Sequence, residues 1–179
     1  EFDPAGKVLH AWGGPNYVPG WPQHLQSMAV DGEGNVWISG TEPGDSIQKF
    51  SPDGKLLWDF GRRWPKDREF KQDNQSVELL SGIEDFGLDN DAQEIYVSDG
   101  ARNKRILVFD MKTGAFKRGW GGHGLPLAEI DNDPTPPYDI SGPPPELKQF
   151  VPLLHCVHVS RDGMVYVCER GNDRMQVFT

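Results

Sequence analysis

A β-hairpin pattern that occurs three times constrains this chain more than any other feature. Residues 95–97 and 106–109 are short runs of β-branched and aromatic residues on either side of a polar turn. This composition predicts two antiparallel strands joined by a turn. The same pattern recurs at residues 36–50 and 165–178. Three copies of one hairpin predict a repeat architecture.

Each copy has material for two further strands. Upstream of the hairpins, residues 27–31, 85–89 and 156–160 alternate between apolar and polar side chains, as half-buried strands do. Downstream, a phenylalanine precedes a glycine-containing turn and then another strand. The turn glycines suit a tight hairpin with positive φ: Gly6, Gly54 and Gly114. Four antiparallel strands per copy are typical of a propeller blade. We therefore predict an all-β fold, with about three propeller blades in one domain over residues 1–179.

The connections between the predicted blades differ in length. The phenylalanines that mark equivalent places, Phe2, Phe50, Phe109 and Phe178, are separated by 48, 59 and 69 residues. The separation increases because of insertions at about residues 62–81 and 123–152, the second of which is rich in proline. Such insertions on a repeat scaffold either line a binding face or form plain surface loops.

Three aromatic residues in the connections are candidates for ligand binding. Trp64 and Tyr138 belong to the two insertions, and Trp21 precedes the first complete blade. Large aromatic side chains outside the predicted strands can present contact area to a ligand.

Three blades are too few to close a propeller ring, which has roughly 4–8 blades. Strand edges left open favour association. We therefore expect either a longer propeller or two copies that complete one another. Residues 7–12 could supply the missing fourth strand of the blade that ends at Phe178. The chain begins with Glu1 rather than Met, so we expect it to have been processed or cut from something longer.

Composition excludes some function classes. The formal net charge of −9 argues against a nucleic acid as the partner and is consistent with a soluble surface. The sequence has no apolar run of the length needed for a transmembrane helix.

These motifs resemble the NHL-repeat family of six-bladed propellers. Its repeat is similar to the residues at 31–39, 95–99, 103–109, 120–122 and 172–178. Within this family the chain looks most like the peptidyl-α-hydroxyglycine α-amidating lyases, which implies a zinc ion held near the ring axis by histidines of separate blades. His155 stands at one ligand position, whereas Gln26 occupies the corresponding place in the first blade. Ala101 stands where the resemblance implies a catalytic tyrosine.

His155 is thus a candidate metal ligand, since imidazole suits zinc. The alternatives are a contact to substrate or a hydrogen-bonded histidine near the channel. His158 is three residues away on the same predicted strand, so the two side chains should diverge. A calcium ion in the axial channel, held by backbone carbonyls, is compatible with the same fold.

Cys156 and Cys168 lie on neighbouring predicted strands. If Val157 pairs with Val167, the two cysteines are directly opposite one another, near disulfide distance. A disulfide would indicate an extracellular or periplasmic protein, whereas free thiols would not.

Two function classes follow. The first is a binding or assembly module whose partner is a peptide, a glycan, a protein or the remaining propeller blades. The second is a zinc-dependent lyase-like enzyme with His155 as a ligand. Gln26 and Ala101 favour the first class.

Overall fold

The computed structural model of the chain describes residues 1–41, 44–61, 72–134, 139, 141–142 and 148–179. Within these ranges the regular structure is β-strand, apart from three short 3-10 segments, η1 (Gly122–Gly124), η2 (Leu127–Glu129) and η3 (Arg170–Asn172). No helix in the described part of the chain is long and apolar enough to cross a bilayer.

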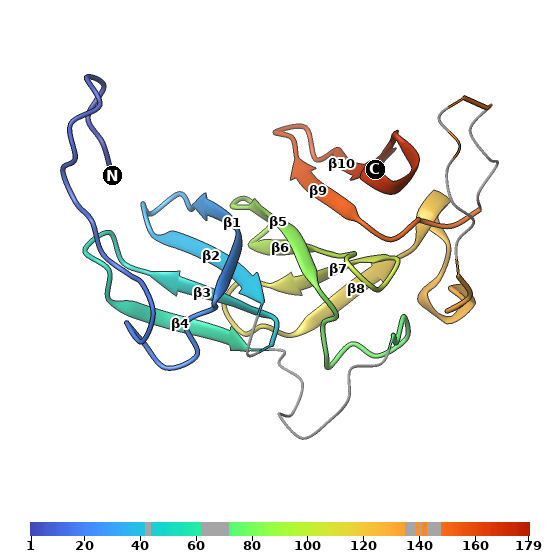
Figure 1. Ribbon diagram of the computed structural model, residues 1–179, viewed down its shortest axis with the longest axis horizontal. Helices are drawn as coiled ribbons and strands as arrows, with labels where there is room; N and C mark the ends of the chain where they lie inside the picture. Colours follow the sequence, from blue (N-terminus) through green and yellow to red (C-terminus); the bar gives the residue numbers. More distant parts are fainter. Residues whose placement is uncertain (42–43, 62–71, 135–138, 140, 143–147) are drawn as a thin grey trace.

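The strands form three antiparallel sheets (Figure 1). Blade 1 contains β1 (His24–Val30), β2 (Val36–Thr41), β3 (Ser46–Phe50) and β4 (Leu56–Gly61). Blade 2 contains β5 (Ile83–Asp89), β6 (Glu94–Asp99), β7 (Arg105–Asp110) and β8 (Phe116–Trp120). Blade 3 contains β9 (Leu154–Val159), β10 (Val165–Glu169) and β11 (Arg174–Phe178). The all-β prediction and the three hairpins are confirmed, although each first strand begins two or three residues earlier than predicted.

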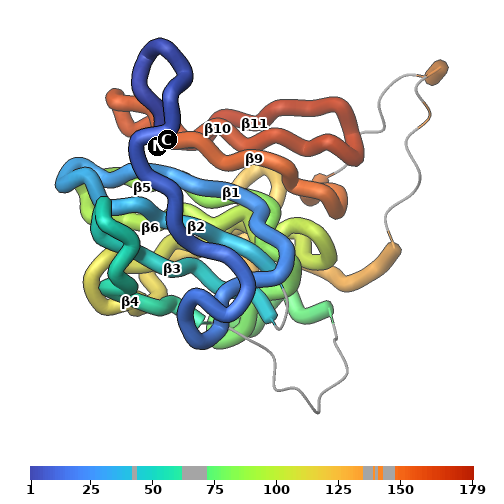
Figure 2. The backbone as a smooth tube through the Cα atoms, turned by 60° about the vertical axis from the view of Figure 1, so that its left-hand side comes forward, coloured from blue at the N-terminus to red at the C-terminus, as the bar shows by residue number. Residues whose placement is uncertain are grey.

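The first strands β1, β5 and β9 lie side by side, so that the three sheets form an arc (Figures 1 and 2). The apolar side chains between neighbouring sheets make two cores. Trp37 and Ile47 of blade 1 pack with Phe109 of blade 2, and Tyr96 and Val108 of blade 2 pack with blade 3. Aromatic and aliphatic side chains thus pack between neighbouring blades. The described strands form an open arc and do not close into a ring.

The N-terminal segment corrects one prediction. Residues 7–12 do not add a fourth strand to blade 3 of the same chain, whose sheet order is β11-β10-β9. Instead Val8 pairs with Phe2 in a separate hairpin. This hairpin and the C terminus lie on opposite sides of the arc in Figure 1. The physical reason is distance, because blades 1 and 2 stand between the two segments.

A buried carboxylate gives blade 2 a testable dependence on pH. Glu94 accepts hydrogen bonds from Arg118 at 2.6 and 2.8 Å and from the Tyr96 hydroxyl at 2.9 Å, and Lys117 also pairs with it. The hydrogen bonds from Arg118 are the main cause that lowers the pKa of Glu94 to about 2 from its ordinary 4.5.

A group with a lowered pKa in the folded state stabilises the fold above its unfolded pKa, and this contribution is lost as the pH falls through the folded pKa. We therefore expect Glu94→Gln to lower the free energy of unfolding at pH 7. The variant should also lose less stability than the wild type between pH 4.5 and 2. Urea denaturation at a series of pH values measures both, and parallel curves for the two proteins would contradict this role.

Candidate functional site

The long connections enter the three blades at the starts of their first strands. The segments 12–23, 61–82 and 121–153 all lead into the start of a first strand, at β1, β5 and β9 respectively. In an antiparallel sheet the starts of the first and third strands lie at the same end. We call this end the loop face. It is the place where a repeat scaffold usually carries variable binding residues.

The three first strands share an irregularity at this face. Each carries a β-bulge against its second strand, which leaves one residue without a partner in the register. The unpaired residues are Gln26 of β1, Glu84 of β5 and His155 of β9. Bulges re-aim a side chain and occur often beside active sites. All three re-aimed side chains are polar.

Two of these side chains lie close together. His155 Nε2 is 3.9 Å from Glu84 Oε2, a pair that becomes an ion pair when the histidine is protonated. The Glu84 side chain is 13% exposed and that of His155 is 54% exposed, so the pair opens to solvent. Gln26 holds the equivalent repeat position on β1, which flanks β5 on the side away from β9. We call Gln26, Glu84 and His155 the bulge residues.

Asp85, the residue that follows Glu84, links the first strands of the three blades. Asp85 Oδ1 accepts a hydrogen bond from the Ser27 hydroxyl of β1 at 2.5 Å. Its Oδ2 accepts one from the Val157 amide of β9 at 3.0 Å. One carboxylate therefore bridges all three blades, directly beside the bulge residues.

His155 and His158 line different pockets, as their spacing predicts. His155 lines a pocket of about 360 Å³ with Arg170 and Asp173 at the loop face. His158 lines a smaller one, about 260 Å³, with residues of β1 and β5. In the described part of the chain, no three His, Cys, Asp or Glu side chains are grouped as a metal site. The structure thus adds Glu84 beside His155, and the zinc prediction stays a prediction.

Trp21 belongs to a groove that runs along blade 1 to the start of β1. The groove has a volume of about 1120 Å³ and is lined by residues 12–25. Within it, Trp21 packs edge to face against Tyr17 and Phe50, with ring centroids 5.7 Å apart in both pairs. Tyr17 donates a hydrogen bond to the Gly54 carbonyl at 3.0 Å. The segment is therefore anchored on blade 1. Trp64 and Tyr138, the other two predicted ligand-binding aromatics, lie outside the described residues.

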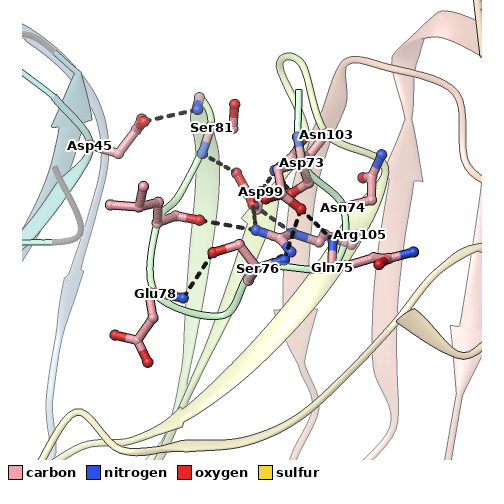
Figure 3. Close-up of polar contacts among 12 residues, drawn as sticks. Asp45, Asp73, Asn74, Gln75, Ser76, Glu78, Ser81, Asp99, Asn103 and Arg105 are labelled. Carbon is pink, nitrogen blue, oxygen red and sulfur yellow. Dashed lines mark hydrogen bonds and ion pairs between the residues drawn. The ribbon is translucent and has the colours of Figure 1, made fainter. Parts of the chain in front are cut away.

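A buried ion pair joins β6 to β7 at the loop face of blade 2 (Figure 3). Arg105 Nη2 lies 2.8 Å from Asp99 Oδ2, and both side chains are fully buried. Arg105 also donates to the carbonyls of Ser76 at 2.5 Å and Leu79 at 3.0 Å. Asp99 Oδ1 accepts from the Ser81 amide at 2.6 Å. The pair thus ties residues 76–81 to the blade.

Asp45 ties blade 1 to the same region. Its two carboxylate oxygens accept the amide protons of Gly82 and Ile83 at 3.0 and 2.9 Å, where β5 begins. Burial raises the pKa of Asp45 above its ordinary value. Asp45 therefore has a structural role, because it fixes the start of the strand that carries Glu84.

Cys156 and Cys168 are opposite one another in the register, and Val157 pairs with Val167 as predicted. The two cysteines form a disulfide, with Cα atoms 5.0 Å apart. The bond joins β9 to β10 immediately after the bulge at His155. It therefore restrains the strand that positions this histidine.

The disulfide predicts the outcome of a thiol assay. Unreduced, denatured protein should give no free thiols in a titration with a thiol reagent, and reduced protein should give two per chain. Reduction should lower the free energy of unfolding by about 2–4 kcal/mol, because the unfolded chain gains freedom. Two titratable thiols in the unreduced protein would contradict the bond.

Ala101 lies where a catalytic tyrosine was expected from the resemblance. Its amide donates to the Gly82 carbonyl at 3.0 Å, next to the bulge of β5. The methyl side chain offers no proton donor or acceptor.

In comparisons with known proteins, no protein-family model and no curated protein matches the chain.

Proposed function

We propose that this chain is a propeller-type binding module that holds a peptide, a glycan or a segment of another protein on its loop face. The observation that carries the proposal is that the three bulge residues occupy equivalent positions at the loop face, with Glu84 and His155 3.9 Å apart. A bulge at the same place in each first strand presents a polar side chain at the loop face.

The surroundings support a ligand of this kind. The groove lined by residues 12–25 adjoins the start of β1, and it offers aromatic and proline surface next to exposed Gln26. Ligand sites commonly combine apolar walls with a few fixed polar groups. Here the polar groups stand on strands cross-linked by Asp85, so a ligand meets a pre-formed surface.

Arrays of immobilised peptides and glycans, probed with the fluorescently labelled protein, test this proposal. We expect a defined set of spots, with signal reduced at least about tenfold in Glu84→Gln and in His155→Ala. A tenfold loss corresponds to about 1.4 kcal/mol, which is the range of one hydrogen bond to a charged group.

His158→Ala is the matched control, since it removes an exposed histidine from the same strand but away from the bulge. It should retain the signal of the wild type. Circular dichroism of each variant should match that of the wild type. Equal binding by the wild type, Glu84→Gln and His155→Ala would contradict the proposal.

A zinc-dependent lyase-like activity is the second candidate. It is favoured by the position of Glu84 beside His155, since a carboxylate near an imidazole can join it as a ligand or orient it. A zinc ion there would supply Lewis acidity. Gln26 and Ala101 count against this candidate. Release of glyoxylate from an α-hydroxyglycine peptide, lost in His155→Ala, would favour it over the binding module.

The proposed compartment is extracellular or periplasmic. The disulfide supports this proposal, because such bonds persist mainly in oxidising compartments.

A further inference from the structure

Leu153, two residues before His155, has a backbone conformation that leucine rarely adopts. Its φ angle is +75°. Glycine enters this left-handed region readily, whereas a larger residue is strained there because its Cβ atom approaches the following carbonyl oxygen. Strained residues of this kind cluster at ligand sites, where the strain serves the function. The conformation of Leu153 therefore directs attention to what its side chain does.

The equivalent residue of blade 2 shows that the fold does not need a leucine at this position. Gly82 stands two residues before Glu84, just as Leu153 stands two residues before His155. Gly82 has a φ angle of +89°. A glycine thus makes the same entry into a first strand without strain.

Blade 3 also has the room that this leucine needs. In blade 2, a Cβ atom on Gly82 would lie only 2.3 Å from the Cβ atom of Ala101. The residue of blade 3 that corresponds to Ala101 is Gly171, because Asp99 and Glu169 occupy equivalent places in the two registers. The side chain that blade 2 excludes at this position is therefore accommodated in blade 3.

Hydrogen bonds to both neighbouring blades fix the backbone of Leu153. Its amide donates to the Gly100 carbonyl of blade 2 at 2.6 Å, and the Leu154 amide donates to the same oxygen at 3.3 Å. Its carbonyl accepts a hydrogen bond from the Arg170 amide of blade 3 at 3.0 Å. Strain persists only where the surrounding structure over-determines it, as these bonds do.

The side chain of Leu153 gains little from burial. Leu153 is 39% exposed, whereas Leu154, the next residue, is fully buried in the core between blades 2 and 3. Leu153 does not belong to either apolar core of the described residues. A strained backbone that presents an exposed leucine does not stabilise the fold, so a contact outside the fold explains this residue better.

Polar groups of the loop face lie close by along the chain. His155 is 54% exposed at its side chain, and its Nε2 atom is 3.9 Å from Glu84 Oε2. Leu153 thus adds an exposed aliphatic side chain beside a fixed polar pair. Ligand sites commonly have this combination of apolar surface and a few placed polar groups.

We propose that Leu153 is a specificity-determining residue of the loop face, which contacts an apolar side chain of a bound peptide while Glu84 and His155 bind a neighbouring polar group. This inference rests on the proposed function and narrows its ligand to peptides that carry an apolar side chain. A glycan fits less well, because burying its hydroxyl groups against an aliphatic side chain costs free energy.

Leu153→Asn separates the contact from the fold. Asparagine is similar in size to leucine and is much more tolerant of positive φ. The urea midpoint of Leu153→Asn should therefore equal or exceed that of the wild type. Leu57→Asn is the matched control, because Leu57 is 47% exposed on β4 near the end of blade 1 opposite the loop face.

An array of short peptides of varied sequence, printed beside glycans and probed with the labelled protein, tests the contact. We expect bound peptides that share an apolar side chain. Leu153→Asn should lower their signal about tenfold, as should replacement of the apolar side chain by serine in the peptide. The two changes together should cost no more than either alone, since both remove one contact. Leu57→Asn should keep the wild-type signal.

The outcomes separate this inference from the proposed function. Peptide binding that requires Glu84 and His155 but is unchanged in Leu153→Asn would overturn the inference and leave the proposed function intact. Binding that is confined to glycans would overturn it as well. A urea midpoint of Leu153→Asn well below that of the wild type would give the leucine a role in folding, which would also overturn the inference. Binding that requires neither Glu84 nor His155 would contradict the proposed function and this inference together.

Discussion

Replacement of Arg105 by leucine should lower the free energy of unfolding by about 3–5 kcal/mol, because it leaves a buried carboxylate without its cation. Asp99 and Arg105 are both fully buried, and the guanidinium also satisfies the carbonyls of Ser76 and Leu79. The substitution removes the ion pair and two hydrogen bonds to backbone carbonyls at once. Urea denaturation followed by tryptophan fluorescence measures the loss.

The double variant Asp99→Asn, Arg105→Leu separates the charge from the other contacts. Without the carboxylate, loss of the cation no longer leaves a buried charge unpaired. The double variant should therefore lose less free energy of unfolding than the sum of the two single losses. Arg118→Leu, which affects a partly exposed ion pair in the same blade, is the comparison and should cost less. Strict additivity of Asp99→Asn and Arg105→Leu would contradict the importance of the ion pair.

The second large effect is expected at the contact between blades 1 and 2. Phe109→Ala should lower the free energy of unfolding by about 3–5 kcal/mol, since it opens a cavity in a fully buried core. Phe109 packs against Phe60 across the two sheets, with ring centroids 4.7 Å apart. The loss therefore weakens the contact that sets the angle between the blades. Thermal and urea denaturation measure it.

Phe178→Ala is the matched control for this prediction. Phe178 holds the equivalent position in blade 3, where it is only partly buried, against Trp120 and Phe150. Its removal from the isolated chain should cost about 1–2 kcal/mol. Equal losses for Phe109→Ala and Phe178→Ala would contradict the difference in burial.

Much of the fold could be predicted because the repeat carries its information locally. Strand composition and turn residues gave the three hairpins, and the turn glycines Gly6, Gly54 and Gly114 have the positive φ that a tight turn needs. The opposed positions of Cys156 and Cys168 followed from strand pairing alone. The assignment of the chain to NHL repeats remains a prediction.

The candidate site could be predicted only in part. His155 was singled out, but Glu84 was missed, because a bulge depends on how two strands pair and not on the type of residue that it contains. An alignment of the three first strands would have found it, since Gln26, Glu84 and His155 occupy one column. The role of Asp45 was hidden for another reason. It bonds to amides 37 and 38 residues away, and no local pattern encodes that contact.

Nuclear Overhauser contacts around Asp85 test the central claim most directly, namely that the first strands of the three blades lie side by side and so place the bulge residues on one face. We predict cross-peaks from the Asp85 β-protons to the Val157 amide proton and to the Ser27 β-protons, because one carboxylate bonds to both residues. Asp85→Ala should make the Val157 amide exchange faster with solvent. A spectrum with the contacts inside each sheet but none between β5 and either neighbour would contradict the arc and the site built on it.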